Sequence, residues 1–231
     1  MPEDNIHVNH RKRVKERFLR EGLDGFLPHE ALELLLYYTN PRGDTNPTAH
    51  RLIDEFGGLD GVMDADFDDL LTVNGVGKES ALFLKLLPAL CRRYYTARYK
   101  EVHRFKSPAE IGEFFRSLFV GETTELVYAL YLDNSVKMLR LTQISRGGFS
   151  RVSLDVRKIV ETAIRVQATG IVLAHNHPKG LALPSQSDAE ATRELFLTLQ
   201  RMDIRLEDHI IAGEDDYVSM RLSQDFHGIF E

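Results

Sequence analysis

The hydrophobic pattern changes its period near residue 100, and this change constrains the fold more than any other feature of the sequence. Before it, apolar residues recur at helical spacing, as in the segment 29–39. After it, short apolar runs rich in strand-forming residues alternate with helical patterns. We therefore predict a helical domain over residues 1–98, a charged linker over 99–106 and an α/β (α+β) domain over 107–231.

The first domain reads as a series of helices. Helical spacing over 29–39 stops at a turn containing two prolines and a glycine, and a second helix is predicted over 47–56. A short helix, a tight turn at 73–77 and a long helix from Lys78 then resemble a helix-hairpin-helix. Amide N–H groups exposed by the two glycines of this turn favour an anion such as phosphate. A compact helix connection without a ligand explains the same pattern, and both interpretations stay open.

The second domain should contain a sheet covered by helices. Ser107 and Pro108 are suited to begin a helix that ends near Phe119, and two strands joined by a tight turn follow it. The predicted strands are 125–132, 136–144, 170–174, 204–212 and 217–220, and the further helices are 156–168 and 187–202.

Charge is segregated along the chain. Net charge is −6, but six basic residues fall within 11–20, six more lie within 92–106, and seven acids without a base occupy 54–69. The basic clusters suit weak DNA contact through the N-terminal domain, whereas the acidic stretch argues against strong binding. A DNA-binding module is therefore the alternative to an enzyme.

Cysteine content and hydropathy exclude other classes. Cys91 is the single cysteine, so neither an internal disulfide nor a zinc site built on paired thiolates is available. The longest apolar run, 126–132, has seven residues, whereas a membrane-spanning helix needs about 20. The N-terminal residues are polar and acidic, so we expect a cytoplasmic protein without a membrane partner.

A group of metal-ligating residue types follows the apolar run 170–174. His175 and His177 stand two positions apart, so in extended backbone both imidazoles face the same side. Ten residues separate His177 from Asp188, in a loop that contains proline and glycine. Two imidazoles and a carboxylate leave one tetrahedral position open, as in catalytic zinc sites, although the same set suits non-haem Fe(II).

The same residues also have a purely structural interpretation. The histidines can be hydrogen-bonded polar residues at a strand end. Ser185 and Asp188 have the spacing of a capping box for the helix that follows. Capping and metal binding can coexist at these positions.

The motif His175-x-His177-Pro178-x6-Ser185-x2-Asp188 resembles the JAMM (MPN-plus) metalloprotease signature. The segments 144–180 and 207–219 resemble the bacterial RadC family closely. The resemblance covers nearly the whole chain, because RadC proteins also carry an N-terminal helical region with a Gly-x-Gly hairpin. It implies an MPN-like mixed sheet flanked by helices, and a zinc metallopeptidase that hydrolyses a peptide or isopeptide amide. The family name also implies a link to DNA repair.

The resemblance further implies a role for each residue. His175, His177 and Asp188 would ligate Zn²⁺, which lowers the pKa of its bound water towards about 7. Glu125, which opens the strand 125–132, would serve as the general base and return the proton to the leaving amine. Ser185 would donate a hydrogen bond to the oxyanion. Without the resemblance, Glu125 would be interpreted as an ordinary strand-end charge.

Two further features accompany this motif. Lys179 stands where family members usually have serine, which puts a cation beside the expected metal, and Lys158 stands where an acid is common. Asp208 and His209 match a family pair. They could support a ligating imidazole or serve the strand structure alone, and both interpretations stay open.

Overall fold

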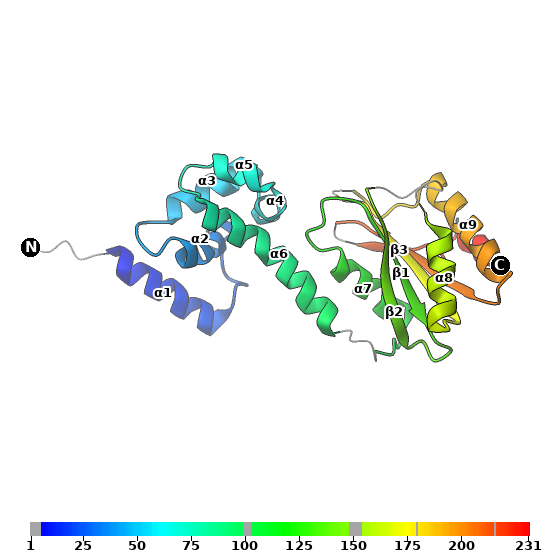
Figure 1. Ribbon diagram of the computed structural model, residues 1–231. Coiled ribbons are helices and arrows are strands. Elements are labelled where there is room, and N and C mark those ends of the chain that lie inside the picture. The colour runs from blue at the N-terminus through cyan, green and yellow to red at the C-terminus, as the bar shows by residue number, and fades with distance from the viewer. Residues whose placement is uncertain (1–5, 99–102, 148–153, 179, 215) are drawn as a thin grey trace, which may run out of the picture. The chain divides into compact units, whose positions relative to one another are not determined.

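A computed structural model describes residues 6–98, 103–147, 154–178, 180–214 and 216–231 (Figure 1). The chain forms two compact units, Met1–Leu90 and Cys91–Glu231. The linker over 99–106 stays a prediction, because residues 99–102 lie outside the described part of the chain. Among the described residues, no helix is both long and apolar enough to cross a membrane.

The described part of the N-terminal unit contains helices and no strand. Its elements are α1 (Ile6–Glu21), α2 (Pro28–Thr39), α3 (Asn46–Phe56), α4 (Leu59–Asp64), α5 (Phe67–Thr72) and the beginning of α6 (Lys78–Arg98). The predicted helices 29–39 and 47–56 are confirmed as α2 and α3. The sequence pattern did not reveal α1, which is mostly polar, or α4, which has six residues and an internal glycine.

The turn between α5 and α6 packs into the core of this unit. Val73 and Val76 are buried, and the N–H of Val76 donates to the carbonyl of Val73 at 3.0 Å. Gly75 has a φ of +94°, and a Cβ at this position would collide with Thr48 Oγ1. The turn is therefore a compact helix connection, and its assignment as a helix-hairpin-helix stays a prediction.

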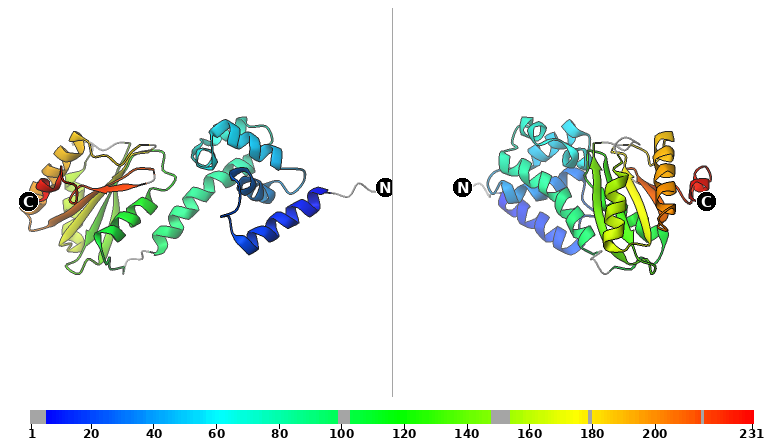
Figure 2. Two further views of the ribbon diagram at one scale, coloured as in Figure 1. Left: turned by 180° about the vertical axis from the view of Figure 1, so that it is seen from behind. Right: turned by 45° about the vertical axis from the view of Figure 1, so that its right-hand side comes forward.

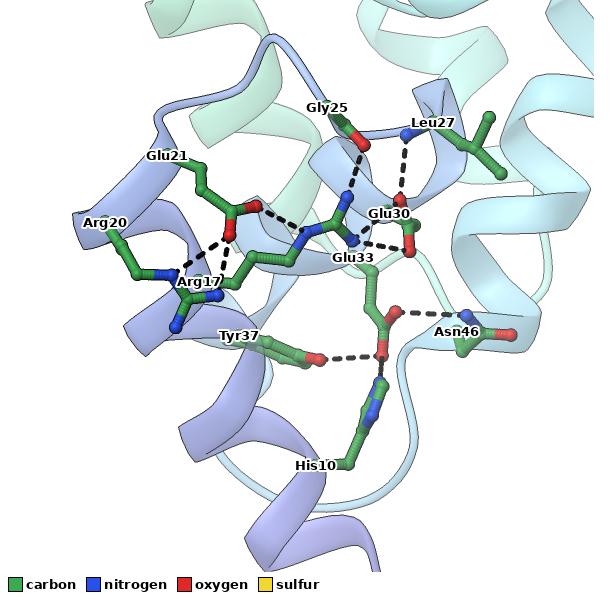
Figure 3. A network of polar contacts seen from close by, with 10 residues as sticks. All are labelled: His10, Arg17, Arg20, Glu21, Gly25, Leu27, Glu30, Glu33, Tyr37 and Asn46. Atoms are coloured by element: carbon green, nitrogen blue, oxygen red, sulfur yellow. Dashed lines mark hydrogen bonds and ion pairs between the residues drawn. The ribbon is translucent and has the colours of Figure 1, made fainter.

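A buried carboxylate joins α1, α2 and α3 (Figure 3). Glu33 in α2 is 2% exposed and accepts a hydrogen bond from the Tyr37 hydroxyl at 2.7 Å. His10 Nε2 lies 3.0 Å from the same oxygen, and the side-chain amide of Asn46 donates to the other oxygen at 3.0 Å. The polar network thus fastens α1 to the two helices that follow it.

The C-terminal unit is built on one mixed five-stranded sheet, which confirms the predicted fold class. The strand order is β2-β1-β3-β4-β5, in which only the β3–β4 pair is parallel. The strands are β1 (Leu126–Leu132), β2 (Met138–Arg146), β3 (Gly170–Asn176), β4 (Arg205–Ala212) and β5 (Tyr217–Ser219).

Helices cover both faces of the sheet (Figures 1 and 2). α7 (Pro108–Leu118) packs on one face, and Ser107 is its N-cap as predicted. α8 (Val156–Val166) and α9 (Gln186–Gln200) pack on the other, and a 3₁₀ turn at His227–Phe230 contacts α9. The central strand β3 is therefore buried along its whole length, as its continuous apolar pattern predicted.

Successive side chains of β3 point to opposite faces of the sheet. Ile171 and Leu173 belong to the core shared with α8 and α9, whereas Val172 and Ala174 belong to the core shared with α7. Because side chains alternate in a strand, His175 projects to the α8–α9 face. This is the face on which α9 carries Asp188.

Candidate metal centre

The structure brings His175, His177 and Asp188 together at the end of β3. His175 Nε2 lies 3.0 Å from His177 Nε2 and 3.5 Å from Asp188 Oδ1, and His177 Nε2 lies 4.0 Å from Asp188 Oδ2. One potential ligand atom from each residue lies within 4.8 Å of the other two. The proline- and glycine-containing loop therefore returns the carboxylate to the imidazoles.

These separations fit a small tetrahedral cation. Zinc bonds to nitrogen and oxygen are about 2.0–2.2 Å long, so tetrahedral ligand atoms stand about 3.3 Å apart. The 3.0 and 3.5 Å distances between ligand atoms of His175, His177 and Asp188 lie on either side of this value. Three protein ligands leave one position for a further ligand.

A backbone carbonyl fixes the orientation of the His177 ring. His177 Nδ1 lies 3.0 Å from the carbonyl oxygen of Leu181, which can only accept a hydrogen bond. Nδ1 therefore carries the proton in the neutral ring, and Nε2 presents its lone pair to His175 and Asp188. The donor set is thus chemically suited to a cation.

Asp188, which belongs to the candidate metal centre, also caps the first turn of α9 together with Ser185. Its Oδ2 accepts hydrogen bonds from the Ser185 N–H at 2.6 Å and the Ser185 hydroxyl at 2.7 Å, and its own N–H donates to that hydroxyl at 3.2 Å. The predicted capping box is therefore present. Because Ser185 has one hydroxyl proton and gives it to Asp188 here, its role as an oxyanion donor stays a prediction.

Burial favours the neutral forms of His175 and His209. His175 is fully buried, and burial lowers its pKa from the ordinary value. The Asp188 carboxylate opposes this effect only in part, and His177 adds to it. His209 is also fully buried, and the same cause lowers its pKa well below the ordinary range. Neutral imidazole is the form that ligates a metal.

Glu125 lies immediately before β1, the strand that pairs with β3. Val127, two residues after Glu125, pairs with His175 of β3 in the antiparallel β1–β3 ladder. Glu125 is half-buried, and its carbonyl accepts a hydrogen bond from the Gly147 N–H at 2.8 Å. The position suits the predicted base, and the catalytic role stays a proposal.

Asn176, between the two histidines, holds the backbone on both sides of Glu125. Its Oδ1 accepts from the Leu126 N–H at 2.7 Å, and its Nδ2 donates to the Thr124 carbonyl at 3.2 Å. Sequence reasoning did not identify this residue. Asparagine is uncommon in strands, so its place in a buried run was the available signal.

The Asp208 carboxylate holds the sheet together. It accepts hydrogen bonds from the Ser219 hydroxyl at 2.5 Å, the His209 N–H at 2.7 Å and the Arg221 N–H at 3.0 Å. It therefore fastens β4 to β5 and to the segment after it. Lys158 donates to the Gln143 carbonyl at 2.7 Å, which joins α8 to β2. Lys179 lies outside the described residues.

Comparison with known proteins identifies a family and a relative of the chain. Residues 105–225 match the family model described as RadC-like JAB domain. Over 217 residues, the chain is 37% identical to UPF0758 protein FN0909 of Fusobacterium nucleatum subsp. nucleatum, and the alignment covers 91% of this chain and 94% of the relative. The chain therefore shares its C-terminal domain with the family model and nearly its full length with this relative.

Proposed function

The chain belongs to the RadC family and carries a RadC-like JAB domain, and from this premise we propose that it is a zinc-dependent hydrolase of a peptide or isopeptide amide. The coarser conclusion, a RadC-like JAB protein with a His-His-Asp group that could hold a metal, already follows from the comparisons and the geometry. Zinc and amide hydrolysis are the proposed steps beyond it.

One observation carries the proposal: potential ligand atoms of His175, His177 and Asp188 converge on one point. His177 Nε2 and Asp188 Oδ1 both present lone pairs there, and His175 Nε2 lies 3.0 and 3.5 Å from them, respectively. A cation between these atoms would accept a lone pair from each of them. Two histidines and one carboxylate are a ligand set of catalytic zinc sites, because a fourth position stays open.

The chemistry follows from the residues around that point. Bound Zn²⁺ would act as a Lewis acid and lower the pKa of a coordinated water towards about 7. Glu125 would accept a proton from the attacking water and return it to the departing amine. Asn176 would hold Glu125 in place through the backbone on either side of it. Ser185 would stabilise the oxyanion once its hydroxyl turns away from Asp188.

Metal analysis tests the first part of the proposal. Protein purified without oxygen should contain about one zinc per chain, and His175→Ala should abolish it. Iron in place of zinc would reject the zinc assignment. Full zinc occupancy in a variant lacking both His175 and His177 would reject the ligand set.

Comparison of cleavage products tests the second part. Cells carrying Glu125→Gln should lose peptide fragments that wild-type cells contain. Glu161→Gln is the matched control, because Glu161 is an exposed glutamate of α8 that pairs with Arg157. Identical fragments in wild-type and Glu125→Gln cells would reject amide hydrolysis.

Basic residues of the segment 11–20 make contacts within the N-terminal unit. Arg11 donates to the Gly43 carbonyl at 2.6 Å, Arg17 pairs with Glu30, and Lys15 lies over the Tyr38 ring. Of these contacts, the pair with Glu30 offsets a charge that would otherwise attract a phosphate backbone. DNA contact therefore stays a prediction, and gel-shift affinities at two salt concentrations test it, because DNA binding must weaken with salt.

A further inference from the structure

His209 is a fully buried histidine with a hydrogen-bond partner at each ring nitrogen. It lies within β4, in register with Leu173 of β3, and is 0% exposed. Its Nε2 lies 2.8 Å from His175 Nδ1, and its Nδ1 lies 2.6 Å from the Thr192 hydroxyl of α9. A buried ring held at both nitrogens can be neutral in two tautomers, and the neighbours decide which one forms.

A backbone carbonyl settles the direction of this chain of hydrogen bonds. The Thr192 hydroxyl lies 2.5 Å from the carbonyl oxygen of Asp188, which can only accept. Met220 Sδ lies 3.7 Å from the same hydroxyl and is a much weaker acceptor. The single hydroxyl proton of Thr192 therefore points to Asp188, so that Thr192 must accept the hydrogen bond from His209 Nδ1–H.

The same logic continues to His175. A neutral His209 with its proton on Nδ1 has a lone pair on Nε2, so His175 Nδ1 must carry a proton and donate it. A neutral His175 then has its lone pair on Nε2, the atom that lies 3.0 Å from His177 Nε2 and 3.5 Å from Asp188 Oδ1. The direction fixed at the Asp188 carbonyl thus determines the metal-facing atom of His175.

We propose that His209 and Thr192 are positioning residues that set the tautomer and ring orientation of His175 for metal binding. The inference rests on the metal centre of the proposed function and is independent of amide hydrolysis. We call His175, His209, Thr192 and the Asp188 carbonyl the imidazole chain. It begins and ends on two proposed ligands, and its four residues are at most 2% exposed. It therefore fixes the distance between β3 and α9 as well as the tautomer.

Tautomers can be measured directly in the metal-free protein. Two-bond ¹H–¹⁵N correlation spectra of protein labelled at histidine distinguish a protonated Nδ1 from a protonated Nε2. Wild-type protein should show His175 and His209 both protonated at Nδ1, with signals assigned through His175→Gln and His209→Gln. Protonation of His175 at Nε2 would overturn the proposal.

Zinc affinity, measured by competition with a chromophoric chelator, provides the second readout. His209→Phe keeps a ring but removes the acceptor, and should weaken zinc binding about 10- to 100-fold. Thr192→Val keeps the shape but removes the hydroxyl, and should also weaken binding and lose the Nδ1–H signal of His209. His209→Gln, which can still accept from His175, should restore part of the affinity.

Thr198→Val is the matched control. The Thr198 hydroxyl donates to the Glu194 carbonyl at 2.9 Å, which is the same contact four residues back on the same helix, but it lies at an exposed position. This variant should bind zinc as wild type does. Equal zinc affinity in wild type, His209→Phe and Thr192→Val, measured where all are folded, would assign the imidazole chain to stability alone and reject the proposal. Weakened zinc binding without any amide hydrolysis would reject only the proposed function.

Discussion

Asn176 Oδ1 accepts a 2.7 Å hydrogen bond from the backbone N–H of Leu126, a residue fifty positions earlier in the chain. The same side chain donates to the Thr124 carbonyl at 3.2 Å. One amide thus replaces the backbone pair that would extend the β1–β3 ladder beyond Val127 and His175. The residue between the two histidines is thereby joined to the segment that carries Glu125.

Asn176→Ala should destabilise the C-terminal unit by about 1–3 kcal/mol, because it leaves the Leu126 N–H buried without an acceptor. Zinc affinity should change little, whereas any hydrolysis that depends on Glu125 should fall. Urea unfolding and chelator competition measure the two effects. An unchanged unfolding midpoint would contradict the role assigned to this side chain.

Zinc should stabilise the C-terminal unit selectively. A ligand that binds only folded protein at a free concentration 100 times its Kd adds about 2.7 kcal/mol. Calorimetry with zinc or with a chelator should therefore shift the transition of this unit and leave that of the helical unit in place. His177→Ala should abolish the shift. A shift that survives in this variant would place the zinc elsewhere.

Ser185→Ala should reduce both stability and metal affinity. It removes the N-cap of α9, which costs about 1 kcal/mol, and it removes the hydroxyl that orients Asp188. Ser185→Thr keeps the hydroxyl and should lose much less of either. A fall in catalytic rate with unchanged stability and zinc affinity would instead assign Ser185 to the oxyanion alone.

Glu33→Ala should destabilise the helical unit by about 3 kcal/mol, because it leaves the buried hydroxyl of Tyr37 and the amide of Asn46 without their shared acceptor. The effect should appear only in the thermal transition of that unit, since the network lies within α1 to α3 (Figure 3). Equal loss in both transitions would show that the two units unfold together.

Glu30 should make the stability of the helical unit depend on pH. The N–H of Leu27 and then the guanidinium of Arg17 lower the pKa of Glu30 below its ordinary value of 4.5, against the opposing effect of burial. A lowered pKa stabilises the fold above 4.5 and loses this effect as the pH falls through the lowered value. Glu30→Gln should therefore cost more stability at pH 7 than at pH 3 in urea unfolding. An equal cost at both pH values would contradict this.

The sequence predicted those parts of the fold that local patterns determine. The helix α2 and the buried strand β3 follow from their apolar spacing, and the His-x-His-x10-Asp group lies together because a short loop joins its members. By contrast, α1 is held by contacts such as that of His10 with Glu33, which its own polar sequence does not reveal.

Parts of the candidate site that depend on distant segments could not be predicted. Asn176 contacts Leu126, and His209 reaches His175 across 34 residues. Neither contact leaves a periodic signal in the sequence. The pairing of Asp208 and His209 was visible, but only the geometry separates the carboxylate that fastens β5 from the imidazole that faces His175.

The Asp188 carbonyl that orients Thr192 belongs to the main chain, so no side-chain replacement can delete it. Asp188→Asn would take away a charged ligand and still leave the hydroxyl of Thr192 with the same acceptor. The two imidazoles would then remain preset for a cation that they bind less well. The protein can therefore lose its metal and still keep the hydrogen bonds that orient the two imidazoles.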